Sequence, residues 1–181
     1  MAYNANEVAL WILTEAKKQG IPITHMKLQK LLYYTQAYSI AMTGQPLFYN
    51  VIQAWEHGPV IPDVYHSYRK YGTHIIRDFQ PTAIPDDLAA FIAAVIHDKG
   101  HMTAYELSDM THKEATWINA RNNPVSNTIT INMLSDFFMQ DFWTSDEDDE
   151  YQPAFNSAEE EDRYFKNNVT EEERNAILAS R

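Results

Sequence analysis

The stretch that decides the fold class runs from Thr24 to Gly44 and reads THMKLQKLLYYTQAYSIAMTG. Threonine is a favoured helix N-cap because its hydroxyl accepts a free backbone N–H, and glycine tolerates the left-handed conformation that ends many helices. Between these two residues the apolar side chains recur at helical spacing, at Leu28, Leu31, Leu32, Tyr38 and Met42. The stretch therefore predicts a long helix with one apolar face.

Similar patterns on both sides predict further helices. They are expected at Asn6 to Lys18, Pro62 to about Lys70, Pro85 to Gly100, from Thr103, near Lys113 to Ala120, and from Thr130. In the last of these, Ile131, Leu134, Phe137, Phe138 and Phe142 are expected to face inward. Between Val51 and Trp55 the sequence is better suited to an extended segment than to a helix.

These elements predict a mainly α protein. We expect a single compact domain of about six to seven helices with a short extended or β segment, spanning residues 1–143. An acidic C-terminal tail follows, with a mobile linker at 144–168 and a short helix at 169–181. The expected helix begins at Thr170, where a threonine followed by three glutamates forms a capping-box pattern.

Composition excludes several classes of function. There are no cysteines among the 181 residues, so disulfides and thiolate metal sites are excluded. There is no basic N-terminal leader and no apolar run of membrane-spanning length, so we expect a cytoplasmic protein without membrane contact. The net charge is −11. Because no basic stripe offsets this charge, direct binding of nucleic acid is not expected.

The sequence offers little support for catalysis, a metal or a cofactor. His97 and His101 are four residues apart, but Gly100 lies between them where the helix should end. His112 has acidic neighbours, an arrangement that is usual on a helix surface. No glycine-rich phosphate loop or metalloprotease motif occurs. We therefore expect a protein that is not an enzyme and that needs no cofactor.

Amphipathic aromatic residues suggest a protein interface. Tyrosine and tryptophan bury a large area while keeping a polar group, which makes them frequent at interfaces. The candidates are Tyr33, Tyr34, Tyr38, Trp55, Tyr65 and Trp117. The alternative is that these rings form a tyrosine-rich edge of the core.

The tail is the second feature that suggests binding. Between Ser145 and Asp162 there are nine acids and no Lys or Arg, with Tyr151 and Phe155 among them. Such a segment can fold onto a basic partner surface, or it can serve only as a solvating tail. Deletion of residues 145–181 would separate these alternatives, because an electrostatic role predicts weaker binding with a strong salt dependence.

Three motifs follow one another along the chain. The first consists of KLQKLLYYTQAY (27–38) and GQPLF (44–48), and the second is AWEHGPVIPDVY (54–65). The third consists of ELS (106–108) and THKEATW (111–117). In this order the three motifs resemble the Panacea domain, the family of SocA-like and GepA-like proteins. The resemblance extends from about Val8 to Phe142 and leaves out the acidic tail.

The resemblance implies a type II antitoxin, often encoded in prophages, that neutralises a cognate toxin by direct binding. Toxins of such pairs include relatives of alarmone synthetases that act on nucleotides or tRNA. The alternative that the family offers is an adaptor that delivers a client toxin to a host protease. The residues expected to bind the toxin are Tyr33, Tyr34, Tyr38, Trp55, Glu56, Tyr65, Trp117, Tyr151 and Phe155.

Overall fold

The computed structural model describes residues 3–144, with side chains as far as residue 140. Its helices are α1 (Ala5–Lys18), α2 (His25–Thr43), α3 (Pro62–Tyr68), the 3-10 turn η1 (Arg69–Tyr71), α4 (Asp86–Lys99), α5 (Ala104–Lys113), α6 (Ala115–Arg121) and α7 (Ile131–Thr144). Its strands are β1 (Ile52–Trp55), β2 (Gly58–Val60) and β3 (Thr128–Ile129). The expected linker beyond Thr144 and the expected terminal helix lie outside the described residues.

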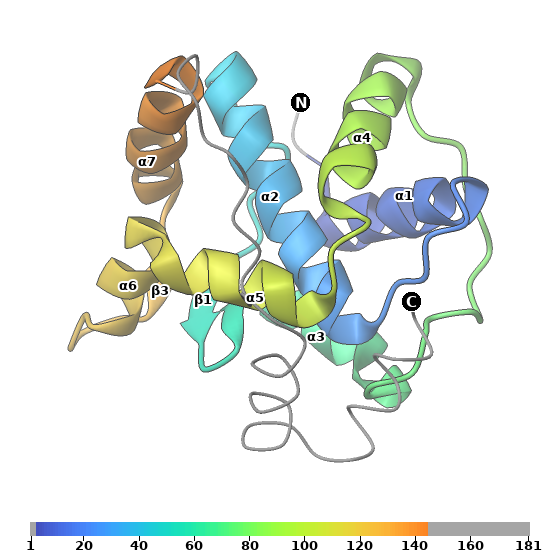
Figure 1. The fold of residues 1–181 in the computed structure, drawn as a ribbon, viewed down its shortest axis with the longest axis horizontal. Helices are drawn as coiled ribbons and strands as arrows, with labels where there is room; N and C mark the ends of the chain where they lie inside the picture. Colours follow the sequence, from blue (N-terminus) through green and yellow to red (C-terminus); the bar gives the residue numbers. More distant parts are fainter. Residues whose placement is uncertain (1–2, 145–181) are drawn as a thin grey trace, which may run out of the picture.

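The mainly α fold class is confirmed. Seven α-helices and a small sheet make up residues 3–144 (Figure 1). β1 is the central strand and pairs antiparallel with β2 on one side and with β3 on the other. The sequence predicted β1 only. β3 was not predicted because it is only two residues long, and β2 was not predicted because it contains Pro59 and proline is rare within strands.

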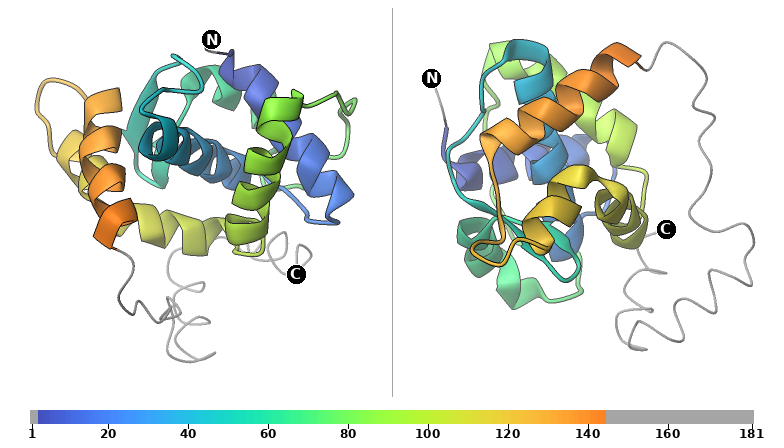
Figure 2. Two further views of the ribbon diagram at one scale, coloured as in Figure 1. Left: turned by 90° about the horizontal axis from the view of Figure 1, so that it is seen from above. Right: turned by 90° about the vertical axis from the view of Figure 1, so that its left-hand side faces the viewer.

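Helix α2 is the centre of the molecule. In the view from above, α1, α4, α5 and α7 surround it (Figure 2), and it contacts each of them. Among its 19 residues, the side chains that are not buried are those of Met26, Tyr38, Met42 and Thr43. The predicted ends of α2 are confirmed, but the expected single apolar face is wrong, since Met42 is 59% exposed and nearly every other side is buried.

Polar side chains on α2 are buried because they bind loop backbone. Gln36 accepts hydrogen bonds from the backbone N–H groups of Leu47 and Phe48, and its amide donates to the Phe48 carbonyl at 2.7 Å. Gln29 accepts from the N–H of Ile61 at 2.8 Å. A buried polar group is tolerated when its hydrogen bonds are made. The polar residues of α2 therefore fix the connections around the helix.

The predicted helix caps are largely confirmed. The hydroxyls of Thr24, Thr103 and Thr130 each accept a backbone N–H of the first turn. Thr103 and Glu106 form the expected capping box. In α7, Leu134 and Phe138 are buried as expected, but Ile131 is 37% exposed. The side chain of Phe142 lies beyond the part described.

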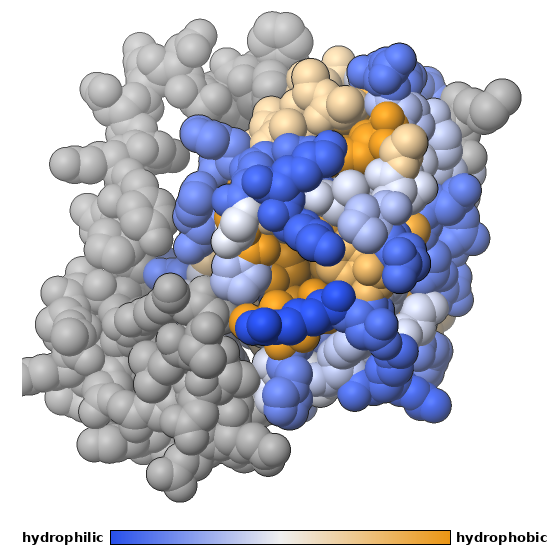
Figure 3. All heavy atoms as spheres, turned by 90° about the vertical axis from the view of Figure 1, so that its right-hand side faces the viewer, coloured by the Kyte–Doolittle hydropathy of each residue, from blue (hydrophilic) through white to orange (hydrophobic). Residues whose placement is uncertain are grey.

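A second face of the molecule is built by α1, α4 and the connection between η1 and α4. Apolar side chains are visible there in a hollow between hydrophilic ones (Figure 3).

None of the helices described between residues 3 and 144 combines the length and apolar character needed to cross a membrane.

Candidate functional site

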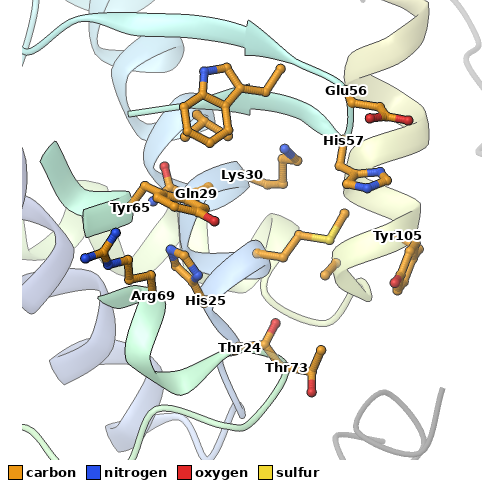
Figure 4. A pocket seen from close by; sticks show the side chains of 15 residues that line it. Thr24, His25, Gln29, Lys30, Glu56, His57, Tyr65, Arg69, Thr73 and Tyr105 are labelled. Carbon is orange, nitrogen blue, oxygen red and sulfur yellow. The ribbon is translucent and has the colours of Figure 1, made fainter. Parts of the chain in front are cut away.

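A pocket of about 440 Å³ opens beside the β1–β2 hairpin. We call it the hairpin pocket. It lies between the N-terminal end of α2, the hairpin, α3 with η1, and the first turn of α5 (Figure 4). The lining residues are Thr24, His25, Met26, Gln29, Lys30, Trp55, Glu56, His57, Val60, Tyr65, Arg69, Gly72, Thr73, Ala104 and Tyr105. Its size falls within the range of small-ligand sites, about 300–1,000 Å³.

Aromatic rings form one wall of the hairpin pocket. The rings of Trp55 and Tyr65 are 4.9 Å apart between centroids, and that of His25 is 4.7 Å from Tyr65. The Trp55 indole N–H donates to the side chain of Gln53 at 2.8 Å. Trp55 and Tyr65 are half-buried. The wall is therefore held in place but open to a partner on one side.

Hydrogen bonds from side chains of α2, α5 and α6 hold the hairpin in place. The Lys30 ammonium donates to the Pro59 carbonyl at 3.0 Å. The Ser108 hydroxyl donates to the His57 carbonyl at 2.9 Å, and the Trp117 indole N–H donates to the Trp55 carbonyl at 3.0 Å. Gly58 makes the turn with a φ of +96°, which favours glycine. The Gly58–Pro59 turn is therefore held in a fixed position against α2 and α5.

A buried charged cluster lies directly beneath the hairpin. Burial lowers the pKa of Lys30 to about 7, and the nearby Glu114 carboxylate opposes this shift. Glu114 accepts hydrogen bonds from the hydroxyls of Tyr33 and Tyr34, at 2.5 and 2.8 Å. Burial, followed by the charge of Glu114, raises the pKa of both tyrosines well above the ordinary value. The tyrosines therefore serve as neutral donors to one carboxylate.

The structure brings three of the predicted residues together. Trp55, Glu56 and Tyr65 all line the hairpin pocket. Trp117 is half-buried beneath them, with its ring 4.2 Å from that of His112. Tyr38 lies elsewhere, where its ring contacts Phe138 and its hydroxyl donates to Asp98.

Tyr33 and Tyr34 require a correction. Their exposed fractions are 0% and 1%, so both are core residues and offer no surface to a partner in this conformation. The alternative interpretation, a tyrosine-rich core edge, describes these two better. Tyr151 and Phe155 lie outside the described residues.

The polar residues of the pocket were not predicted from the sequence. They include His25, Gln29 and Lys30, and the four-residue spacing of His25 and Gln29, which places both on one side of the helix, is a usable signal. Arg69 on η1 was also missed. Within residues 3–144, no three His, Cys, Asp or Glu side chains lie together as a metal site would require.

The stability of the fold should rise with pH above about 7. Lysine has an ordinary pKa of 10.5, whereas burial lowers the pKa of Lys30 to about 7 and that of Lys27 to about 8. Between these values the unfolded chain binds more protons than the folded one, so the free energy of unfolding increases by up to about 1.4 kcal/mol per pH unit for each lysine.

Urea unfolding between pH 6.5 and 9.5 measures this dependence. The Lys30→Met variant should show a shallower rise, because only Lys27 then titrates in this range in the same direction. Equal slopes in the two proteins would contradict the assignment to Lys30.

Comparison with known proteins agrees with the motifs. The family model for the Antitoxin SocA-like, Panacea domain matches residues 28–118, from α2 to α6. Antitoxin SocA of Caulobacter vibrioides (strain NA1000 / CB15N) is 31% identical over 145 residues, which cover 68% of this chain and 73% of that protein. No solved structure matches the chain. The chain therefore belongs to the SocA-like antitoxin family that shares the Panacea domain.

Proposed function

We propose that the protein acts in the cytoplasm as an antitoxin, and that it neutralises a toxin protein by binding it through the face that carries the hairpin pocket. Family membership supports an antitoxin role and a toxin partner in general. It also supports a role that is not catalytic. Which toxin is bound, and by which surface, is the part that we propose.

We choose this surface because of one observation, the aromatic wall of the hairpin pocket, which hydrogen bonds of Trp55 hold in place. Interface hot spots are typically Trp, Tyr and Arg residues around well-packed pockets, with a polar rim. Trp55 and Tyr65 supply the aromatic centre, and the exposed side chains of Glu56, His57 and Arg69 supply the rim. Because α2, α5 and α6 hold the hairpin, the surface is ordered before binding, which reduces the entropic cost of association.

The first experiment identifies the toxin. The neighbouring gene is expressed from an inducible promoter with and without this protein, and the two products are then purified together. The proposal predicts that toxicity is relieved and that a stable complex is recovered. Relief of toxicity by loss of the toxin, without a stable complex, would instead favour the protease adaptor.

Replacing Trp55 with alanine tests the surface. The variant should weaken toxin binding by at least about 30-fold, because removal of a hot-spot side chain typically costs 2 kcal/mol or more. The measurement is the Kd of the purified pair, together with the growth assay. Tyr49→Ala is the matched control, since Tyr49 is 69% exposed and lies outside the hairpin pocket.

Circular dichroism and the Tm of both variants exclude unfolding as the cause. Equal affinities of the Trp55→Ala and Tyr49→Ala variants would place the toxin on another face.

A further inference from the structure

Two buried nitrogen atoms at the inner end of the hairpin pocket have no hydrogen-bond partner among the described residues. They are His25 Nε2 and Gln29 Nε2. Both residues line the pocket, with exposed fractions of 7% and 2%. Buried polar atoms are nearly always paired, because an unpaired one loses its bonds to water without replacement. Two such atoms in one pocket point to a ligand that would supply the missing partner.

The chemistry required of the ligand follows from Gln29. Its Oε1 atom accepts from the Ile61 N–H at 2.8 Å, which fixes the orientation of the amide. The unpaired Nε2 atom is therefore a donor, and it requires an acceptor. His25 is neutral at pH 7, because burial lowers its pKa to about 4, and a neutral imidazole can carry its proton on Nε2. The two side chains together can hold one oxygen-bearing group.

The electrostatics of the pocket favour a negative charge on that group. Two cations line the pocket, with the Arg69 guanidinium at the rim and the Lys30 ammonium on the Pro59 carbonyl beneath the hairpin, while Glu56, the single acid among the lining residues, is exposed. In addition, the amino end of α2 lies at the pocket, and its first turn holds no acidic residue that would offset a positive charge there. The amino end of a helix of 19 residues carries a partial positive charge that attracts anions.

The remaining walls are apolar or aromatic, formed by Met26, Trp55, Val60, Tyr65 and Ala104. These walls suit a hydrocarbon or aromatic stem. A phosphate with two charges is typically held by bidentate arginine contacts, and Arg69, the one arginine of the lining, lies at the exposed rim. A carboxylate on an apolar stem matches both the polar end and the apolar walls.

We propose that the hairpin pocket is a carboxylate-binding site, in which Gln29 and His25 donate hydrogen bonds to the carboxylate and the aromatic wall packs against its stem. The toxin supplies this carboxylate from its own chain when it docks. This inference rests on the proposed function for its partner, but the site itself can be tested without the toxin.

The test of the site uses 3-phenylpropionate as the probe and the uncharged 3-phenylpropionamide as its control. Both are titrated into the isotope-labelled full-length protein and followed by NMR. The acid should shift the Gln29 side-chain amide and the His25 ring nitrogen signals, and the amide should bind at least about tenfold more weakly because the charge-assisted hydrogen bonds are lost. Equal binding of acid and amide, or no binding of either, would overturn the proposal.

Two variants separate the ligand role from a structural one. His25→Phe keeps a ring against Tyr65 and removes both nitrogen atoms, while Gln29→Glu keeps an acceptor for the Ile61 N–H and removes the donor. Each should lose at least about tenfold in affinity for 3-phenylpropionate. His25→Phe should also raise the Tm of the free protein, because it removes a buried unpaired atom. Unchanged affinity in both variants would show that these residues do not form the site.

The purified toxin completes the test. Toxin binding should displace 3-phenylpropionate, and His25→Phe should weaken toxin binding although its Tm is higher. A toxin complex that forms while the probe stays bound would overturn this use of the pocket but leave the antitoxin role standing. Failure of the unmodified protein to bind the toxin at all would overturn the proposed function instead.

Discussion

Replacing Glu114 with alanine should lower the free energy of unfolding by about 3–5 kcal/mol, the range typical when one partner of a buried charged interaction is removed. Glu114 is 8% exposed and accepts hydrogen bonds from the hydroxyls of Tyr33 and Tyr34. Its charge also offsets the burial of Lys30. The variant therefore leaves two buried hydroxyls without their acceptor and removes the charge that supports protonation of the buried Lys30.

Urea unfolding at pH 7 measures this effect. Glu56→Ala is the control, because Glu56 is an exposed acid on the same side of the molecule and its replacement should change stability by less than about 0.5 kcal/mol. If Glu114→Ala destabilised the protein no more than Glu56→Ala does, the buried cluster would not hold the fold together as described.

Replacing Gly58 with alanine should cost roughly 2–4 kcal/mol, since it combines backbone strain with overpacking. Gly58 has a φ of +96°, and an added Cβ would lie 2.7 Å from both Lys30 Nζ and Thr111 Oγ1. Relief of this clash requires movement of the buried lysine or of the hairpin. Because Lys30 and Trp55 both line the hairpin pocket, binding of the toxin should weaken as well.

The Gly44→Ala variant separates the cost of backbone strain from the cost of overpacking. Gly44 also has a positive φ, +68°, but an added Cβ would meet nothing within 4 Å. The control should therefore show only the strain, about 1 kcal/mol. Equal losses in thermal or urea unfolding of the two variants would mean that the contact with Lys30 does not matter.

Much of the fold could be predicted from local chemistry. The ends of α2 followed from a capping threonine and a glycine, and the start of α5 followed from a capping box. These signals act over three or four residues, so the sequence displays them directly. The burial of α2 on nearly every side could not be predicted, because Gln29 and Gln36 look like surface residues until the loops that they bind are in place.

The residues of the candidate site could likewise be predicted only in part. Trp55, Glu56 and Tyr65 lie within one short motif, and the structure places them around one pocket. Tyr33 and Tyr34 looked equally suited to an interface, but their hydroxyls bind Glu114, which is 80 or more residues away in the chain. A pairing at that separation leaves no periodic trace in the sequence. His25 and Gln29 were missed because their significance depends on which of their atoms lack a partner.

The most direct test of toxin binding through the hairpin pocket is isothermal titration of the purified toxin into this protein, its Trp55→Ala variant and its Tyr49→Ala variant. Binding through this face predicts a stoichiometric complex with the unmodified protein, the same affinity for Tyr49→Ala, and at least about 30-fold weaker binding for Trp55→Ala. Relief of toxicity in cells without any measurable binding, or equal binding by all three proteins, would contradict it.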